Sequence, residues 1–359
     1  MADFSTRSRC SDAEGTGIAS TEAGLLMESP PRLRVRSPWW WTYAVRQALA
    51  FAVLGGLLFL MFHMTSANLQ SRGIQSGFAF LWEPSRTPVT DAPIVVEAGV
   101  DSYATAFAAG ALNSLKLTVA SVVAATVVGL LVGLGRLSQN ALARKLCAGY
   151  VEAMRNVPVL LHVFLWYGLI LGLPTASQAS SFGHFLLATN RGVYLAWFGL
   201  DANGNWSLIH PVVDGFEVKG GIFMSPEFAA LFIGISLYSA AFIAEIVRAS
   251  VGSLPRGQWE ATAALGLSRG TTLRRVVLPQ ALRVAMPPLT SEYLGIFKNS
   301  TLAVAIGYQD FMAISTTMLT DTGQAVEVMA IVMAFYATVS LLASAVMHAY
   351  GHRHMRWGL

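Results

Sequence analysis

The chain alternates long apolar segments with polar stretches that carry most of its charges. A helix needs about 20 mainly apolar residues to cross a bilayer, and six segments approach or exceed that length. We predict membrane helices over residues 44–64, 112–134, 157–173, 228–247, 284–306 and 326–348. The predicted fold class is an all-α polytopic membrane protein with about six transmembrane helices.

The polar stretches set the remaining boundaries of this prediction. Residues 1–43 are expected to form an N-terminal tail and residues 65–111 a loop outside the cell membrane. Residues 174–227 are expected to form a long loop, because their apolar pieces are too short to span. The predicted membrane domain covers residues 112–348 and contains a charged loop at 248–283. Residues 349–359 are expected to form a short C-terminal tail.

Composition supports a membrane protein and restricts its chemistry. Hydrophobic residues make up 54% of the chain and charged residues only 12%, whereas soluble domains carry about 25% charge. With both termini in the cytoplasm, 18 of the 24 Lys and Arg residues lie on the cytoplasmic side, as the positive-inside rule requires.

Cys10 and Cys147 have no metal-ligand spacing and are interpreted as free thiols. No nucleic-acid partner, metal or cofactor is expected.

The loop before the fifth predicted span has an internal order of its own. Residues 257–279 read GQWEATAALGLSRGTTLRRVVLP, with several charges that lipid would not tolerate. Good helix formers precede Gly266, which is a plausible helix stop. Trp259, Ala263 and Leu267 recur every four residues and would form one small apolar face. The pattern predicts a short helix at the membrane surface with a face available for docking.

This stretch resembles the coupling loop of permease subunits of ATP-binding-cassette (ABC) importers. The resemblance implies a type I ABC importer permease fold and a cytoplasmic coupling helix that fits a groove on a separate ATPase subunit. Thr262 stands where the family commonly has a second Ala. The alternative is an ordinary cytoplasmic loop with one helical turn. The residues to which the resemblance assigns ATPase coupling are Gly257, Gln258, Glu260, Ala261, Ala264, Gly266, Leu278 and Pro279.

The fifth predicted span is the candidate substrate path, because it is the one that contains both polar groups and adjacent prolines. Pro287 and Pro288 should kink or break the helix. Charges inside a span normally face protein or a watery cavity. For an amino-acid substrate, Glu292 could face the ammonium and Lys298 the carboxylate, with Asn299 and Ser300 adding donors. The alternative is that Lys298 extends to the outer interface and Glu292 pairs with a basic residue of another helix.

Two further patterns concern how the predicted helices pack. Gly129 and Gly133 lie four residues apart in the second span, where a neighbouring helix could approach closely. Glu245 and Arg248 lie three apart at the end of the fourth span and could pair across one helical turn.

Several short runs narrow the resemblance to the polar amino-acid uptake branch of ABC permeases, and it covers about residues 110–350. The runs are Asn113-Ser114-Leu115, Arg155-Asn156-Val157-Pro158, residues 239–248 and residues 297–302. The extra N-terminal span resembles longer permeases of general L-amino-acid systems. Those relatives often have more membrane segment where this chain has residues 174–227.

The resemblance implies a transport subunit that works by alternating access in the bacterial inner membrane, driven by ATP hydrolysed on a partner. No Gly-Lys pair, and hence no P-loop, occurs in the sequence. The implied partners are ABC ATPase subunits, a second homologous permease subunit and a periplasmic amino-acid-binding protein. No catalytic residue is expected. The alternatives are an ABC permease for another small solute and, from other classes, a secondary transporter or a membrane enzyme.

Overall fold

The structure is a computed structural model that describes residues 39–71, 77–178, 181–182, 185–200, 205–215 and 217–355. Most of the predicted N-terminal tail, residues 1–38, therefore lies outside the described residues. The chain divides into two units, residues 1–65 and residues 66–359, and each is described by itself. The first unit contains most of helix α1 (Trp39–Ser71). This helix begins inside the predicted tail and ends inside the predicted loop, but its candidate membrane span, Tyr43–Thr65, agrees with the predicted span at 44–64.

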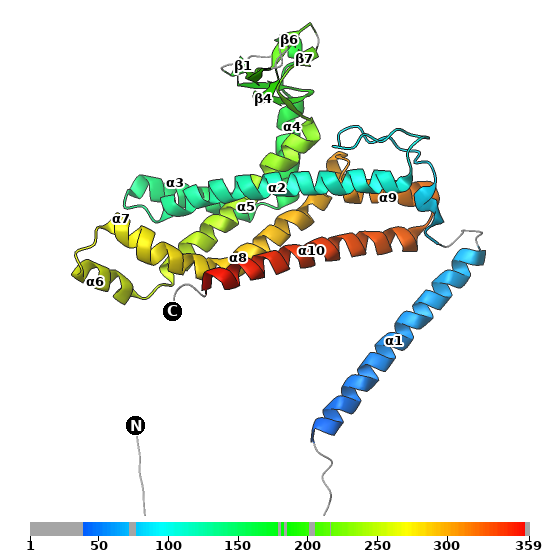
Figure 1. Cartoon of the computed structure of the whole chain (residues 1–359), viewed down its shortest axis with the longest axis horizontal. Helices are drawn as coiled ribbons and strands as arrows, with labels where there is room; N and C mark the ends of the chain where they lie inside the picture. Colours follow the sequence, from blue (N-terminus) through cyan, green and yellow to red (C-terminus); the bar gives the residue numbers. More distant parts are fainter. Residues whose placement is uncertain are drawn as a thin grey trace, which may run out of the picture. The chain divides into compact units, whose positions relative to one another are not determined.

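The second unit is built mainly of helices (Figure 1). Within the described residues, four helices are each long and apolar enough to cross a membrane, and two bent pairs raise the number of spans to as many as six. One of the four is α1, most of which lies in the first unit. The other three belong to the second unit and are α2 (Tyr103–Arg136), α5 (Pro226–Gly252) and α10 (Ala325–Met355). One bent pair is α3 (Ala141–Asn156) with α4 (Val159–Leu171), which turn by 102°.

The second bent pair contains the fifth predicted span. It runs from residue 269 to residue 306 and turns by 50° into α9 (Phe311–Thr322). Its elements are α7 (Arg269–Thr272), the π-helical turn η3 (Leu273–Val277), α8 (Leu278–Asn299) and the 3-10 helix η4 (Ser300–Ile306). Helix α6 (Arg256–Ala264) precedes this pair. The shorter 3-10 helices are η1 (Ala79–Trp82) and η2 (Ala176–Gln178).

Several helix boundaries correct the sequence prediction. Helix α2 begins at Tyr103 rather than at residue 112, because Ser102 caps it by accepting a hydrogen bond from the Thr105 amide at 3.3 Å. Helix α3 occupies a stretch predicted as loop, and Asn140 caps it through the Leu142 amide at 2.9 Å. Helix α9 likewise replaces a predicted loop. Helix α10 continues to Met355, through most of the predicted C-terminal tail.

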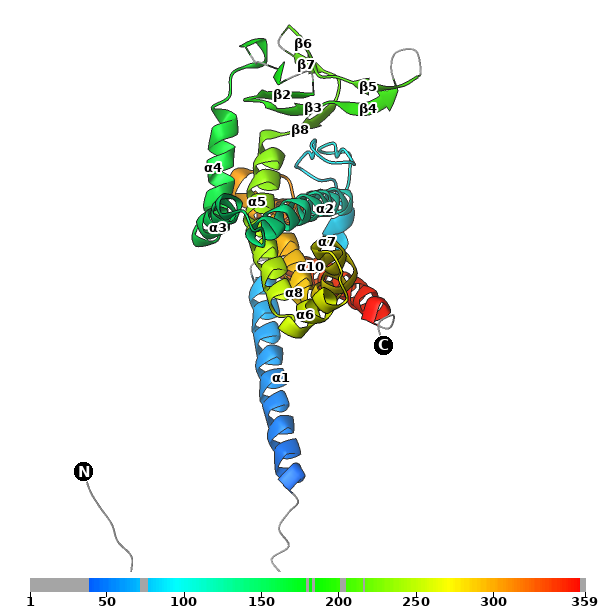
Figure 2. The same cartoon turned by 90° about the vertical axis from the view of Figure 1, so that its left-hand side faces the viewer.

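Residues 174–227, which were expected to form a loop, contain short β-strands within a mostly helical fold. Strands β1 (Ser181–Phe182), β2 (Leu186–Thr189), β3 (Gly192–Leu195) and β8 (Ile222–Met224) form one antiparallel sheet in the order β1-β2-β3-β8. Two-stranded sheets pair β4 (Trp197–Leu200) with β5 (Trp206–Ile209) and β6 (Val212–Asp214) with β7 (Glu217–Lys219). These strands lie at the end of α5 opposite to α6 (Figure 2).

Close packing of α2 against α5 forms the centre of the second unit. A Cβ atom at Gly129 would stand 2.7 Å from the Ile243 side chain, and one at Gly133 would stand 2.9 Å from Val247. Both separations are shorter than real side chains allow, so only glycine permits this approach. The prediction made from the glycine spacing is confirmed. The surrounding core draws further buried residues from α4, α8 and η4.

Pro287 and Pro288 were expected to kink or break α8, and the structure shows no break in this helix. It is continuous from Leu278 to Asn299, and Pro287 and Pro288 lie inside it. Both prolines are on its exposed surface, where the helix has room to adjust the carbonyls that lose their donors. Departures from α-helical geometry occur instead at its two ends, in the π-helical turn η3 and the 3-10 helix η4.

Candidate functional site: the coupling helix and the polar residues of the core

Helix α6 contains the predicted coupling residues and is exposed over most of its surface. Gly257, Glu260, Ala261 and Ala264 are all exposed. The helix ends as predicted, because Gly266 adopts a left-handed backbone with φ of +70°, which a residue with a side chain rarely adopts. The side chain of Leu265 is 76% exposed. An exposed helix that ends in an exposed leucine is suited to contact another protein.

One hydrogen bond between side chains joins α6 to α8. The Gln280 Nε2 atom, in the first turns of α8, donates to Gln258 Oε1 at 3.3 Å. Thr262 is the one residue buried in α6, and its hydroxyl donates to the Trp259 carbonyl at 3.0 Å. The threonine that departs from the usual alanine is therefore accommodated by satisfying its hydroxyl within the helix. The contact through Gln280 links α6 directly to the start of α8, where Leu278 and Pro279 lie exposed.

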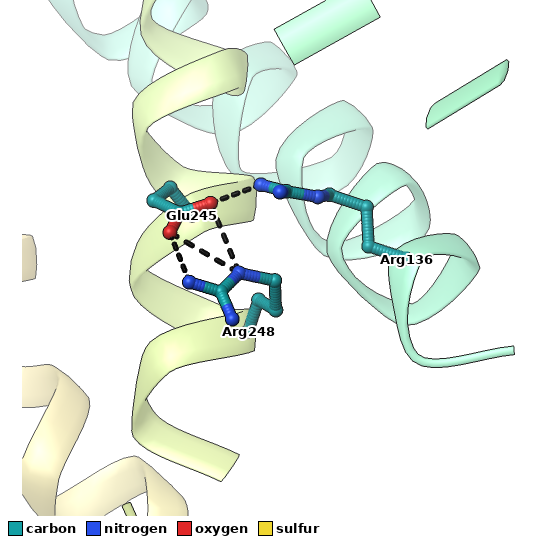
Figure 3. A network of polar contacts seen from close by, with 3 residues as sticks. All are labelled: Arg136, Glu245 and Arg248. Atoms are coloured by element: carbon teal, nitrogen blue, oxygen red, sulfur yellow. Dashed lines mark hydrogen bonds and ion pairs between the residues drawn. The ribbon is translucent and has the colours of Figure 1, made fainter. Parts of the chain in front are cut away.

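Glu245 forms an ionic cluster with two arginines just before α6 (Figure 3). Both of its carboxylate oxygens accept hydrogen bonds from Arg248 Nε at 3.1 Å, and Arg248 Nη2 also donates to Oε1. Arg136 Nη1 donates to Oε2. The pairing of Glu245 with Arg248 is confirmed, while Arg136 was not foreseen. Since Arg136 is the last residue of α2, the cluster ties that end of α2 to α5.

We expect Glu245→Ala to lower the free energy of unfolding by about 2 kcal/mol, because it leaves two arginines without their shared acceptor. The Arg136 side chain is only 17% exposed, so solvent compensates little. Chemical unfolding in mixed micelles measures the change. The matched control is Asp214→Ala, which removes an ion pair with Lys219 whose side chains are 68% and 64% exposed. The control should cost less than about 1 kcal/mol. Equal losses in the two variants would contradict this role of the cluster.

The candidate substrate-path residues of α8 occupy different surroundings. Glu292 is half-buried and lies beside Ser239 of α5. The next residue, Tyr293, shares a hydrogen bond of 3.0 Å with Thr126 of α2. Ser121 and Ser236 are buried, and their hydroxyls have no hydrogen-bond partner among the described residues. Polar groups from α2, α5 and α8 therefore meet inside the core, where an unpaired hydroxyl is costly.

Lys298 does not lie among the polar groups that surround Glu292. Because α8 is continuous, residues six apart differ by about 120° around the helix axis, so Lys298 and Glu292 project in different directions. Lys298 is exposed, Asn299 is half-buried and Ser300 is fully buried. The structure thus does not bring Glu292 and Lys298 together on one face.

The Asn113-Ser114 motif positions the bend between η4 and α9. Asn113 Nδ2 donates to the Gln309 carbonyl at 2.8 Å. The Ser114 hydroxyl oxygen accepts from the Phe311 amide at 3.0 Å. The fully buried Asp310 caps α9 through the Ala313 amide at 2.8 Å. These bonds satisfy backbone groups exposed by the bend, which gives the motif a structural role.

The second unit thus combines a fifth predicted span that bends into α9 with an exposed helix, α6, that precedes it. No group of three or more His, Cys, Asp or Glu side chains that could hold a metal occurs in the described ranges. Residues 125–357 match the family described as "Binding-protein-dependent transport system inner membrane component". The chain belongs to this family and is a multi-pass inner-membrane protein.

Individual relatives extend the similarity over nearly the whole chain. The chain is 37% identical to the putative amino-acid ABC transporter permease protein YhdX of Escherichia coli, over 93% of this chain and 97% of the relative. It is 34% identical to the general L-amino acid transport system permease protein AapQ of Rhizobium johnstonii, over 84% and 89%. It is 32% identical to the glutamate/glutamine/aspartate/asparagine transport system permease protein BztB of Rhodobacter capsulatus, over 83% and 89%.

A solved structure supports the fold. A chain in the crystal structure of an amino acid ABC transporter with histidines superimposes with a TM-score of 0.52 at 23% identity, over 70% of this chain and 95% of that one. The chain thus has the fold of an ABC importer permease. Permease subunits of such importers are transport components, and a separate ATPase subunit hydrolyses the ATP. Transport systems of this family depend on a binding protein, as the family description states.

Proposed function

We propose that this chain is the permease subunit of an ABC importer that moves polar L-amino acids across the bacterial inner membrane by alternating access. The observation that carries the proposal is α6, an exposed helix with the coupling-loop pattern, held to α8 by Gln258 and Gln280. The amino-acid substrate is supported by the relatives, which include an L-amino-acid permease that matches 84% of this chain.

The coupling residues we propose are those that the sequence pattern indicated. Helix α6 presents Glu260, Ala261 and Ala264 to an ATPase subunit, while the start of α8 receives the movement. In this orientation α6 and both termini lie in the cytoplasm, and the β-strands between α4 and α5 lie in the periplasm. The strands are then on the side where an amino-acid-binding protein delivers its ligand. A second homologous permease subunit completes the membrane pathway.

Glu292 is the residue that we propose for contact with the substrate ammonium. It is half-buried in the core, beside Ser239 and next to the Tyr293–Thr126 hydrogen bond. A carboxylate inside a membrane domain needs a positive partner or water. The ammonium of a passing amino acid would provide that partner. Asn299 and Ser300 extend the proposed path, and Lys298 marks its exposed edge.

Uptake by the complete transporter in vesicles tests the substrate class. The permease, its ATPase and its binding protein would be reconstituted and supplied in turn with labelled L-amino acids, a sulfonate and a metal chelate. We expect polar L-amino acids to accumulate and the other solutes to remain outside. Accumulation of a sulfonate or chelate in place of amino acids would favour the alternative ABC permease function.

We expect Glu292→Gln to reduce amino-acid uptake by about tenfold or more, because it removes one charge contact worth on the order of 1.5–3 kcal/mol. ATPase activity stimulated by the binding protein should persist, since α6 is unchanged. Lys298→Met is the matched comparison, because it removes a charge six residues away on the exposed side of α8. Intact uptake in Lys298→Met excludes a carboxylate-binding role for Lys298. Intact uptake in Glu292→Gln would contradict the role proposed for Glu292.

A further inference from the structure

A groove runs between α8 and the C-terminal part of α10. Its volume is about 570 Å³. Apolar side chains dominate its lining, among them Leu282, Met286 and Leu294 of α8 and Met347 of α10. Two polar residues of the lining, Thr290 and Ser291, donate their hydroxyls to carbonyls of their own helix, at 2.9 and 3.4 Å. The hydroxyls are thus already paired, and the groove offers mainly hydrocarbon to an occupant.

The charge of the groove is positive and is confined to one end. Arg283 and His348 line it, and no Asp or Glu does so within the described part of the chain. The apolar window of α10 ends at residue 349, so His348 lies where that helix leaves the hydrocarbon. Arg274 and Arg275, which are exposed, precede α8 at this same end. An occupant with an apolar body and an anionic head would match both parts of the groove.

The length of the groove corresponds to one leaflet of a bilayer. Its lining on α8 runs from Leu278 to Leu294, which is about 24 Å along a helix that rises 1.5 Å per residue. Half of a bilayer with its headgroup region measures about 20–22 Å. The basic end therefore lies at the depth of lipid headgroups, and the far end lies near the bilayer centre.

We propose that this groove binds one anionic phospholipid, in the leaflet nearest to α6. An acyl chain would lie along Leu282, Met286 and Leu294, and the phosphate would contact the Arg283 guanidinium. Basic pockets between membrane helices are suited to anionic headgroups, and guanidinium geometry matches phosphate oxygens. The groove includes Leu278 and Pro279, which follow the coupling segment. A bound lipid would therefore contact the part of α8 that receives movement from α6.

Lipid retention by the purified complex tests the proposal. The complete transporter would be delipidated, exchanged into nanodiscs of phosphatidylglycerol or phosphatidylcholine, and released for native mass spectrometry. We expect phosphatidylglycerol to be retained on the native permease and phosphatidylcholine to be lost. Arg283→Gln should reduce phosphatidylglycerol retention about fivefold, the effect of one basic residue near an anionic lipid. Arg144→Gln removes an equal charge from the exposed surface of α3 and should change retention little.

A second variant tests the apolar part of the groove independently of the Arg283 charge. Met286→Trp fills the apolar part without altering Arg283, and it should abolish retention while the complex stays assembled. Equal retention in native protein, Arg283→Gln and Met286→Trp would overturn the proposal. So would equal retention of phosphatidylglycerol and phosphatidylcholine by native protein. Loss of the second permease subunit in both variants would show that the groove is a subunit interface, and would also overturn it.

Discussion

Glu260→Lys is expected to reduce ATP-driven uptake by about 30-fold or more while the permease still folds. Glu260 is exposed on α6, so its replacement should not disturb the core. A reversed charge on a docking surface costs about 2 kcal/mol or more when the partner is built for the opposite sign. Each 1.4 kcal/mol corresponds to a factor of ten. The measurement is uptake by reconstituted complexes, normalised to the amount of permease inserted.

Glu152→Lys provides the control for this charge reversal. Glu152 is also exposed, but it lies on α3 rather than on the coupling helix. We expect uptake close to the native value in this variant. Copurification of the ATPase subunit should fall for Glu260→Lys and remain unchanged for Glu152→Lys. Undiminished uptake in Glu260→Lys would mean that α6 is an ordinary surface helix.

Gly129→Leu should have the largest effect on folding. A Cβ atom at this position would lie 2.7 Å from Ile243 and 2.9 Å from the backbone oxygen of Ala240. A backbone atom cannot move aside without shifting α5, so α2 and α5 would have to separate. Overpacking of this kind costs about 3 kcal/mol, a large share of the stability of a folded protein. We expect a lowered midpoint of thermal unfolding in detergent and a loss of assembled complex.

Gly168→Leu tests whether the effect of Gly129→Leu comes from helix packing. Gly168 also lies in a membrane helix, α4, but no atom of another helix stands within 4 Å of a Cβ built there. The same substitution should therefore leave the unfolding midpoint nearly unchanged. Similar destabilisation at both positions would attribute the loss to leucine itself rather than to the close approach of α2 and α5.

Hydropathy and local spacing were sufficient to predict much of the membrane domain. The apolar segments gave the spans, because a bilayer imposes length and composition on each helix separately. The good helix formers before Gly266 and the Gly266 stop predicted α6, although Leu267, which was assigned to its apolar face, lies beyond the end of the helix. Three-residue spacing predicted the Glu245–Arg248 pair. Each of these features depends on residues close together in sequence.

Local sequence patterns do not predict features that depend on contacts between distant residues or on very short elements. Arg136 joins Glu245 from another helix, and no local pattern indicates that contact. The strands between α4 and α5 are two to four residues long, which is too short for alternation to be recognised. Helix α3 was predicted as loop because it is too polar on average to be recognised as a membrane span, although its apolar residues follow a helical period. The prolines of α8 were expected to kink or break it, but both lie on the exposed surface of a continuous helix.

The central claim is that this permease moves its substrate only when a separate ATPase drives it. The most direct test measures L-amino-acid uptake into vesicles that contain this permease and its partner permease, with and without the ATPase subunits, with ATP supplied on the side of α6. The account predicts accumulation that requires both the ATPase subunits and ATP and that depends on the binding protein. Accumulation without the ATPase subunits, driven by an ion gradient, would contradict it.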